Sequence, residues 1–435
     1  MTGITYEDFI DLSYEPAPAD LVCTFRIVPA EGMDVEAAAS RVASESSNGT
    51  WAALPTGEGF TDMGATAFDV DAGSDDTGRA ITAADPRVAD DTTEIRVAYP
   101  EGLFEPGSMP QVLSCIAGNI MGMKAVDAIR LVDCEWPEGL ATSFPGPQFG
   151  SAVRSEIFGV EDRPILATVP KPKVGLSTER HAEVGYEAWT GGVDLLKDDE
   201  NLTDQAFNPF QDRLIESLAQ RDRAAEETGE PKSYLINVTA GTNEMLERVD
   251  QVAAEGCEYV MVDVITTGWA AVQTVRERCA ELGLAIHAHR AMHAAFDRLP
   301  NHGVSMRVLA QIARLVGVDQ LHTGTVGLGK LANEDTVGIN AWLRKDLYGL
   351  RDVLPVASGG LHPGLLPDLL DATGTNVCVQ AGGGIHGHPD GTHAGAKALR
   401  AAADAYAAGI SLDAKAEESP ALQTAIDEWG TETPR

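Results

Sequence analysis

The chain has 435 residues, 44% of them hydrophobic, which is enough for two domains or for one barrel with a smaller domain. Its 66 acidic and 32 basic residues give a formal charge of −34, and such a surface repels nucleic acid and anionic membranes. We therefore expect neither as a partner. No apolar run is long enough to span a bilayer and no leader-like segment begins the chain, so we expect a cytoplasmic protein. The acidity also indicates a salt-loving source.

The six cysteines are scattered along the chain, and no two of them form a CxxC pair. This pattern argues against a disulfide framework and against a zinc site. We expect buried free thiols at Cys23, Cys115, Cys134, Cys257, Cys279 and Cys378.

Residues 1–135 mix strand-like and helix-like patterns and are expected to form an α+β domain of ferredoxin-like type. Apolar, β-branched runs predict strands, and 3.6-residue periodicity predicts helices. The expected strands are 21–30, 65–72, 93–100 and 125–137, and the expected helices are 34–46 and 109–122. The Pro- and Gly-rich stretch 137–150 is typical of a linker.

Residues 136–435 form the second expected domain, in which short apolar runs alternate with helical segments. The runs are 164–172, 191–199, 233–239, 258–265, 285–292, 320–324, 354–360 and 377–384. Eight successive strand-then-helix units predict a (β/α)8 barrel, followed here by C-terminal helices. Polar residues gather where the runs end, and that face carries the chemistry of such barrels.

The run "GGVDLLKDDEN" (191–201) ends in a cation followed by three carboxylates. Strand alternation places Lys197 and Asp199 on the same side, and Glu200 can join them from the following loop. Two carboxylates at a barrel mouth suit Mg2+, but an ammonium cannot be the third ligand. A salt bridge that ends the strand explains the spacing equally well.

Two lysines, Lys171 and Lys173, flank Pro172 at the end of the first run. Like charges that face one cavity depress each other's pKa, which would suit a lysine that shuttles protons. Taken alone, the pair is more simply interpreted as two solvated loop lysines.

The fifth run ends in "HAHRAMH", which contains His287, His289, Arg290 and His293, and the sixth run adds His322. Arginine with histidine suits a phosphate, and histidine can transfer protons. A zinc site is weakly supported, because no nearby cysteine completes it. Packed histidines are the plainer alternative.

The last two runs end in "ASGG" (357–360) and "AGGG" (381–384). Barrels of this kind often bind phosphate at these two loops, where glycine lets backbone N–H groups approach the anion. Ordinary tight turns are the alternative. The segment "TVGLGKLANED" (325–335) resembles a mobile lid that carries Lys330, or else a solvated loop.

Together these motifs resemble the large subunit of ribulose-1,5-bisphosphate carboxylase/oxygenase (RuBisCO). The resemblance extends from Glu45 to Gly384 in the order of the family, and "GGVDLLKDDEN" is its most specific element. The segments "KPKVGL", "HAHRAMH", "HTGTVG", "ASGG" and "QAGGGI" support it independently.

The resemblance implies a carboxy-lyase that converts ribulose 1,5-bisphosphate, CO2 and water into two 3-phosphoglycerates, with O2 as a competing substrate. It also implies that Lys197 reacts with CO2 to form a carbamate. Lys197, Asp199 and Glu200 would then hold one Mg2+, and Asp198 would have no metal role. Lys171 would be the acid/base, supported by Lys173.

The other roles follow by position. His289 would contact the central hydroxyls of the substrate, and Lys330 would orient CO2 and pair with Glu45. Further substrate contacts fall into three groups: Arg290 and His322 at one phosphate with Ser358 and Gly359 beside them; Gly360, Gly382 and Gly383 with Thr50 and Trp51 at the other; and Asn119 and Gln380 elsewhere in the site.

In the family Glu45, Thr50, Trp51 and Asn119 come from the partner chain. The minimal active unit would therefore be a head-to-tail homodimer or an assembly of such dimers, with no small subunit expected.

The chain departs from many family members in its lid, which is longer and lacks Glu-Gly after Lys330–Leu331, and in Pro170 before Lys171. The lid resembles archaeal, form III-like members. Together with the acidic composition it suggests a haloarchaeal source and a role in AMP and nucleoside salvage. A RuBisCO-like enolase or isomerase is the first alternative, and a non-catalytic sugar-phosphate-binding protein is the second.

Overall fold

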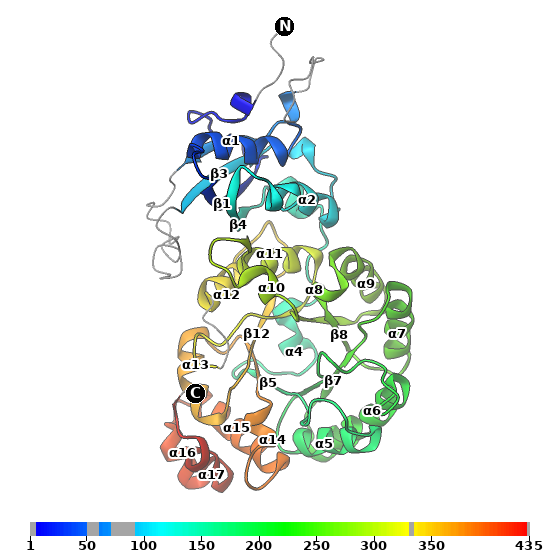
Figure 1. The fold of residues 1–435 in the computed structure, drawn as a ribbon. Coiled ribbons are helices and arrows are strands. Elements are labelled where there is room, and N and C mark those ends of the chain that lie inside the picture. Colours follow the sequence, from blue (N-terminus) through cyan, green and yellow to red (C-terminus); the bar gives the residue numbers. More distant parts are fainter. Residues whose placement is uncertain (1–5, 50–60, 71–91, 330–334, 433–435) are drawn as a thin grey trace. The chain divides into compact units, whose positions relative to one another are not determined.

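The computed structural model describes residues 6–49, 61–70, 92–329 and 335–432 (Figure 1). The chain divides into two compact units. The first comprises residues 1–145, 292–315 and 347–350, and the second comprises residues 146–291, 316–346 and 351–435. Among the helices of the described ranges, none combines the length and the apolar character needed to cross a bilayer.

The first unit contains one five-stranded sheet. Its strands lie in the order β10-β4-β1-β3-β2, and the pairs β4–β1, β1–β3 and β3–β2 are antiparallel. With α1 between β1 and β2 and α2 between β3 and β4, this is the ferredoxin-like arrangement, as expected. The strands are β1 (Leu21–Pro29), β2 (Thr66–Val70), β3 (Thr93–Tyr99), β4 (Val126–Glu135) and β10 (Gly303–Val304).

Helix α1 carries a candidate site residue, Glu45, in its last turn. The helix begins after Asp34, whose carboxylate accepts hydrogen bonds from the backbone N–H groups of Glu36 and Ala37 at 3.1 and 3.3 Å. The helices that lie in or begin in this unit are α1 (Val35–Glu45), α2 (Met109–Ile116), α3 (Glu138–Thr142), α10 (Ala294–Asp297) and α11 (Met306–Val316). The stretch 137–150, which was expected to be a linker, contains the short helix α3.

The second unit contains the predicted barrel. Eight parallel strands close in the order β11-β12-β13-β5-β6-β7-β8-β9. They are β5 (Ile165–Thr168), β6 (Leu195–Lys197), β7 (Ser233–Asn237), β8 (Tyr259–Asp263), β9 (Ala285–His289), β11 (Gln320–His322), β12 (Leu354–Ser358) and β13 (Cys378–Gln380). Each strand lies within one of the eight predicted runs.

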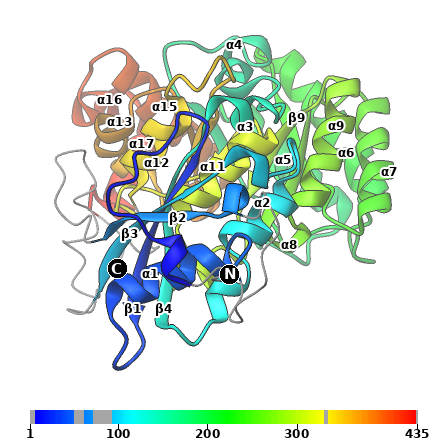
Figure 2. The same ribbon diagram turned by 90° about the horizontal axis from the view of Figure 1, so that it is seen from above.

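Helices follow the strands on the outer side of the barrel, as Figures 1 and 2 show for α5, α6, α7 and α9. The helices of this unit are α4 (Val153–Glu156), α5 (Thr178–Thr190), α6 (Phe210–Thr228), α7 (Thr242–Ala254), α8 (Val264–Thr267), α9 (Trp269–Leu282), α12 (Thr336–Arg344), α13 (Leu366–Thr373), α14 (Gly383–His386), α15 (Thr392–Ala407), α16 (Leu412–Glu418) and α17 (Pro420–Trp429).

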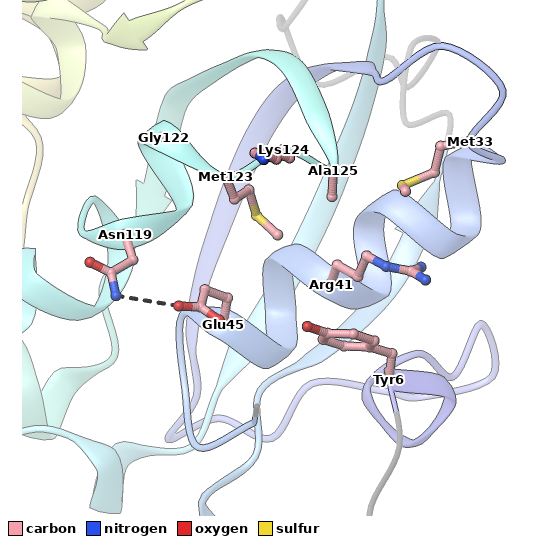
Figure 3. A pocket seen from close by; sticks show the side chains of 9 residues that line it. All are labelled: Tyr6, Met33, Arg41, Glu45, Asn119, Gly122, Met123, Lys124 and Ala125. Atoms are coloured by element: carbon pink, nitrogen blue, oxygen red, sulfur yellow. Dashed lines mark hydrogen bonds between the residues drawn. The ribbon is translucent and has the colours of Figure 1, made fainter. Parts of the chain in front are cut away.

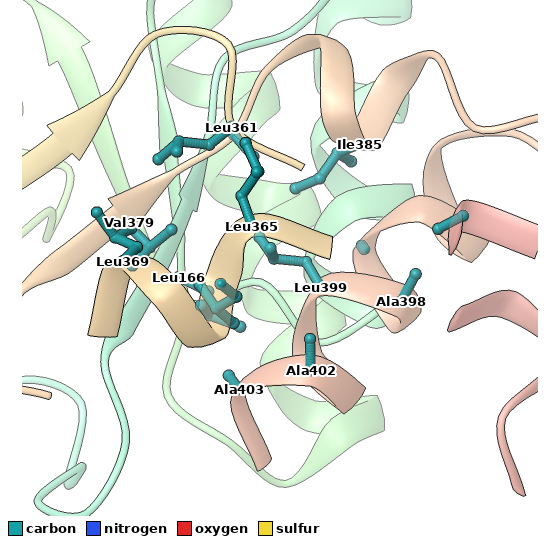
Figure 4. Close-up of a cluster of buried hydrophobic side chains, with 14 of the residues drawn as sticks. Leu166, Leu361, Leu365, Leu369, Val379, Ile385, Ala398, Leu399, Ala402 and Ala403 are labelled. Carbon is teal, nitrogen blue, oxygen red and sulfur yellow. The ribbon is translucent and has the colours of Figure 1, made fainter. Parts of the chain in front are cut away.

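Two apolar cores hold the barrel strands in place. The inner core contains alternate strand residues such as Leu195, Met261 and Val356, closed at one end by Val153 and Phe158. The outer core packs strand residues of the opposite parity against α13 and α15 (Figure 4). It includes Leu166, Val379, Leu365, Leu369 and Leu399. Because both faces of each strand are buried, the strands read as continuous apolar runs.

All six cysteines are free thiols in the described chain. Five are buried, as expected from the sequence, whereas Cys115 is partly exposed and departs from that expectation.

Candidate active site

Strand alternation decides which polar side chains face the barrel interior. Leu195, Met261, Val356 and Cys378 belong to the inner core. The residues two positions further along the same strands therefore point the same way. They are Lys197, Asp263, Ser358 and Gln380, each the last residue of its strand, and the same register places His287 and His289 after Ala285 on β9.

Lys197 lies at the centre of the carboxylate cluster at the end of β6. Its side chain is fully buried, and its Nζ donates to the backbone oxygen of Asp198 at 2.7 Å and lies 3.9 Å from Glu200 Oε2. Burial lowers the pKa of the Lys197 ammonium, although nearby carboxylates, Glu200 foremost, act in the opposite direction. The site therefore favours the neutral amine more than water does.

Asp199 and Glu200 approach Lys197 from the loop after β6. Asp199 is buried and accepts hydrogen bonds from the backbone and side-chain nitrogens of Asn201 at 3.1 and 2.8 Å. Glu200 Oε2 lies 3.6 Å from His289 Nε2. The described residues contain no group of three His, Cys, Asp or Glu side chains able to hold a metal, so these two carboxylates need a further donor.

Asp198 lies on the opposite face of the strand from Lys197 and has its own partners. Its carboxylate accepts from Arg213 Nε at 3.1 Å, Tyr234 Oη at 2.5 Å and the backbone N–H of Asn237 at 3.0 Å. Burial alone would raise the pKa of Asp198, but the Arg213 charge and a hydrogen bond from His181 bring it down to about 2. These contacts hold the Asp198 carboxylate on the side of the strand away from Lys197.

Lys171 follows β5 and lies beside the same cluster, with Nζ 3.6 Å from Asp199 Oδ2. Burial lowers its pKa, and the charges of Asp199 and Glu200 act against that shift. A side chain at Gly382 would approach Lys171, because an added Cβ would lie 3.1 Å from Lys171 Cε. Lys173 is exposed in the same loop.

His289 is oriented by a residue that the sequence analysis did not single out. Its Nδ1 lies 2.8 Å from Asp263 Oδ1, at the end of the adjacent strand β8. Burial raises the pKa of Asp263 to about 7, with Lys197 opposing the shift. Asp263 could have been found in the sequence, because it is the polar residue that ends an otherwise apolar strand.

His322 and Ser358 are also brought together, with His322 Nδ1 2.7 Å from Ser358 Oγ. The other imidazole nitrogen of His322 lies 2.9 Å from His287 Nε2. Arg290 is buried at the end of β9. Of the predicted phosphate residues, the structure therefore pairs His322 with Ser358.

The glycine loop after β12 has the backbone conformation that favours glycine, whereas the glycines after β13 are not at positive φ. Gly359 and Gly360 have φ of 109° and 85°, where only glycine fits without strain. Near the second loop, Gln380 is buried and its Oε1 has no hydrogen-bond partner among the residues that the structure describes. A buried acceptor of this kind is available to a ligand.

In the first unit, Glu45 and Asn119 lie together at a pocket of about 490 Å3 (Figure 3). Asn119 Nδ2 donates to Glu45 Oε1 at 3.3 Å. The pocket wall also includes Arg41 and Lys124, so it has both charge signs. Three predicted site residues, Thr50, Trp51 and Lys330, lie outside the described residues.

Two family models match the chain. The model of the ribulose bisphosphate carboxylase large chain, catalytic domain, matches residues 150–429, and the model of the N-terminal domain of that chain matches residues 8–140. Among curated relatives, ribulose bisphosphate carboxylase of Pyrococcus abyssi is 48% identical over 99% of this chain and 98% of its own length. The enzyme of Archaeoglobus fulgidus is 44% identical over 99% and 98%.

Solved structures are similar over the same extent. Octameric RuBisCO from Pyrococcus horikoshii, in complex with a sulfate ion, has a TM-score of 0.92 and 47% identity, covering 99% of this chain and 98% of that one. A dimeric archaeal RuBisCO from Hyperthermus butylicus has a TM-score of 0.90 and 44% identity, covering 98% and 99%.

Proposed function

Since the chain belongs to the family of ribulose bisphosphate carboxylase large chains, we propose that it is an enzyme that joins CO2 and water to ribulose 1,5-bisphosphate, giving two 3-phosphoglycerates, with competing oxygenation. The observation that carries the proposal is the cluster of Lys197, Asp199 and Glu200 at the barrel mouth, beside Lys171 and His289.

The residues of this cluster fit a magnesium site once Lys197 has reacted with CO2. The reaction needs the neutral amine, and burial favours that form of Lys197. The carbamate would supply the anionic oxygen that the cluster lacks, and Lys197, Asp199 and Glu200 would then hold one Mg2+ through oxygen ligands. Bound there, the ion would stabilise negative charge that develops on substrate oxygens.

Lys171 and His289 are the proton-transferring groups of the proposal. The side chain of Lys171 is 37% exposed, yet desolvation lowers its pKa, which brings the lysine closer to the pH range where it can both take up and release a proton. His289 would face the central carbons of the substrate, and the contact between its Nδ1 and Asp263 Oδ1 orients the imidazole ring.

The two ends of the substrate would be bound by the predicted phosphate groups. Arg290 would serve one phosphate directly and His322 would act there through Ser358, because both imidazole nitrogens of His322 already have partners. Gly360, Gly382 and Gly383 would serve the other phosphate. Among the residues outside the described ranges, Thr50 and Trp51 would complete the second phosphate site, and Lys330 would orient CO2.

We further propose a homodimer, or an assembly of dimers, in which Glu45 and Asn119 complete the site of the partner chain without a small subunit. Archaeal relatives crystallise as a dimer and as an octamer, which supports such an assembly. The acidic surface suits a cytoplasm of high salt, as in a haloarchaeal cell. A role in AMP salvage is part of the same proposal.

The deciding experiment is incorporation of labelled CO2 into 3-phosphoglycerate, with Mg2+ and bicarbonate supplied, at low and at high KCl. The wild-type protein should fix the label, and more so at high KCl, whereas Lys197→Met should fix none while unfolding at a similar temperature. Folded wild-type protein that consumes ribulose bisphosphate without fixing label would instead be a RuBisCO-like enolase or isomerase. A fully active Lys197→Met protein would exclude the carbamate.

A further inference from the structure

A continuous chain of hydrogen bonds crosses the barrel interior and ends at Ser358. Gln320 bridges the first two members, with Nε2 3.1 Å from Tyr259 Oη and Oε1 2.8 Å from His287 Nδ1. His287 Nε2 lies 2.9 Å from His322 Nε2, and His322 Nδ1 lies 2.7 Å from Ser358 Oγ. Four different strands, β8, β9, β11 and β12, contribute to it.

Solvent does not reach the part of this chain that runs from Tyr259 to His287. Tyr259, His287 and Gln320 are fully buried and His322 is 3% exposed, whereas Ser358 is only partly buried. Burial lowers the pKa of His287 to about 3 and that of His322 well below its ordinary value, so both rings are neutral near pH 7. A neutral imidazole has one N–H and one acceptor nitrogen. The direction of one hydrogen bond therefore fixes the direction of the next.

Two directions are compatible with these distances. In the first, the Gln320 side-chain oxygen accepts from His287. His287 must then accept from His322, and His322 must accept from the Ser358 hydroxyl. The hydroxyl of Tyr259 then only accepts, and no hydrogen bond of the described residues takes its buried hydrogen. An unsatisfied buried donor is costly.

The opposite direction follows from turning the Gln320 amide by half a turn, which exchanges two groups of nearly equal size. Tyr259 then donates to the amide oxygen, and the amide nitrogen donates to His287. His287 donates to His322, and His322 donates to Ser358. The buried Tyr259 hydrogen now has an acceptor, and Ser358 keeps its own hydrogen for a ligand.

We propose that Gln320 is a positioning residue that, with Tyr259, directs this chain so that the Ser358 hydroxyl donates to an acceptor oxygen of the bound sugar bisphosphate. The inference rests on the proposed function, which supplies the substrate. A phosphate or carbonyl oxygen accepts hydrogen bonds, and bonds to a charged acceptor are stronger than neutral ones. With the chain reversed, Ser358 would present lone pairs to that oxygen and weaken binding.

The test uses Gln320→Met, which keeps the length of the side chain but removes both amide hydrogen bonds. The dissociation constant of ribulose 1,5-bisphosphate is measured by calorimetry, with Mg2+ and bicarbonate withheld, and KM is measured in the carboxylation assay. We expect both constants to rise about tenfold or more, the effect of losing a hydrogen bond to a charged group. Tyr259→Phe should weaken binding in the same direction, and it serves if Gln320→Met does not fold.

The readout specific to positioning is a double-mutant cycle with Ser358→Ala. If Gln320 acts through Ser358, Gln320→Met should have no further effect on binding once the hydroxyl is absent. Gln311→Met is the matched control, because Gln311 is equally buried and bonds to Trp136 and Asp133 away from the chain. It should lower the unfolding temperature but leave binding unchanged.

Two results would overturn the inference. One is wild-type binding by both Gln320→Met and Tyr259→Phe. The other is an equal loss of binding with and without the Ser358 hydroxyl, which indicates general disruption of the barrel. Either result counts against the inference only if the wild-type protein binds the bisphosphate and turns it over. A wild type that does neither would instead contradict the proposed function.

Discussion

Lys197 and Asp198 are neighbours in the chain, yet their side chains lie in opposite electrostatic environments. Lys197 points into the barrel, where burial favours its neutral form. Asp198 points outward and is kept ionised by Arg213, with a pKa of about 2. Strand alternation alone separates a group that must react as a neutral amine from one that anchors the strand as an anion. The short spacing "KDD" therefore serves stability and chemistry at once.

Gly382 is a second single residue with a clear effect on the site, because its lack of a side chain leaves room for Lys171. In Gly382→Ala the new Cβ would lie 3.1 Å from Lys171 Cε and must push the ammonium aside. Because small displacements of a catalytic group are expensive, we expect kcat to fall by about 10- to 100-fold. The unfolding temperature should barely change, since a lysine chain can move. Steady-state kinetics and calorimetry measure the two effects.

Gly241→Ala is the matched control for this prediction. Gly241 lies in the same unit, and an added Cβ there would meet no heavy atom within 4 Å. Its activity should equal that of the wild type. If Gly382→Ala also retained the wild-type kcat, the contact with Lys171 would have no catalytic importance.

At the scale of elements, the barrel strands were predictable because each is a short apolar run with both faces buried. Lys197, His289 and Ser358 were predictable as site residues because each is a polar residue at the end of such an apolar run. Strand β10 was not predictable, since two residues, Gly303–Val304, carry no period and pair with β4 only through the fold.

Partners that come from distant elements were also beyond the sequence. Arg213 reaches Asp198 from α6, and no spacing rule connects them. Strand alternation could have identified Asp263 and Gln320, because each lies on a strand face that points into the barrel. Neither residue belongs to a recognisable motif. Thr50, Trp51 and Lys330 lie outside the described residues and stay predictions.

An ion pair between elements gives a test of stability that is separate from catalysis. Glu230, in the loop between α6 and β7, contacts Arg400 of α15 at 2.9 Å and Lys232 at 2.9 Å. Burial alone would raise the pKa of Glu230, but the hydrogen bonds from these two cations lower it to about 2. The pair therefore stabilises the fold above the ordinary pKa of a glutamate, and this contribution disappears as the pH falls toward 2.

We expect Glu230→Gln to lower the free energy of unfolding by about 1 kcal/mol at pH 7, because solvent screens this partly exposed group. The difference from wild type should shrink as the pH falls below about 4.3, the usual glutamate value. Denaturant titrations at one ionic strength from pH 7 downward measure it. Glu183→Gln, which breaks an exposed pair with Arg180, is the control and should have almost no effect. A difference that grew toward acid pH would contradict the assignment.

At the scale of the whole molecule, the candidate site residues are divided between the two compact units. Lys171, Lys197 and His289 belong to the second unit, and Glu45 and Asn119 belong to the first. Under the proposed head-to-tail dimer, each active site takes its barrel residues from one chain and its Glu45 and Asn119 from the other. Two chains inactivated in different units could then repair each other.

We therefore expect complementation between Glu45→Gln and Lys197→Met. Each variant alone should be inactive, because every site in its homodimer contains the substitution. When the two are co-produced in equal amounts, half of the dimers are hybrids, and each hybrid has one site free of both substitutions. The mixture should then reach about a quarter of wild-type carboxylation. Native mass spectrometry gives the fraction of hybrids, and each variant mixed with itself is the control. A mixture that contained hybrids and stayed inactive would mean that each site is built within one chain.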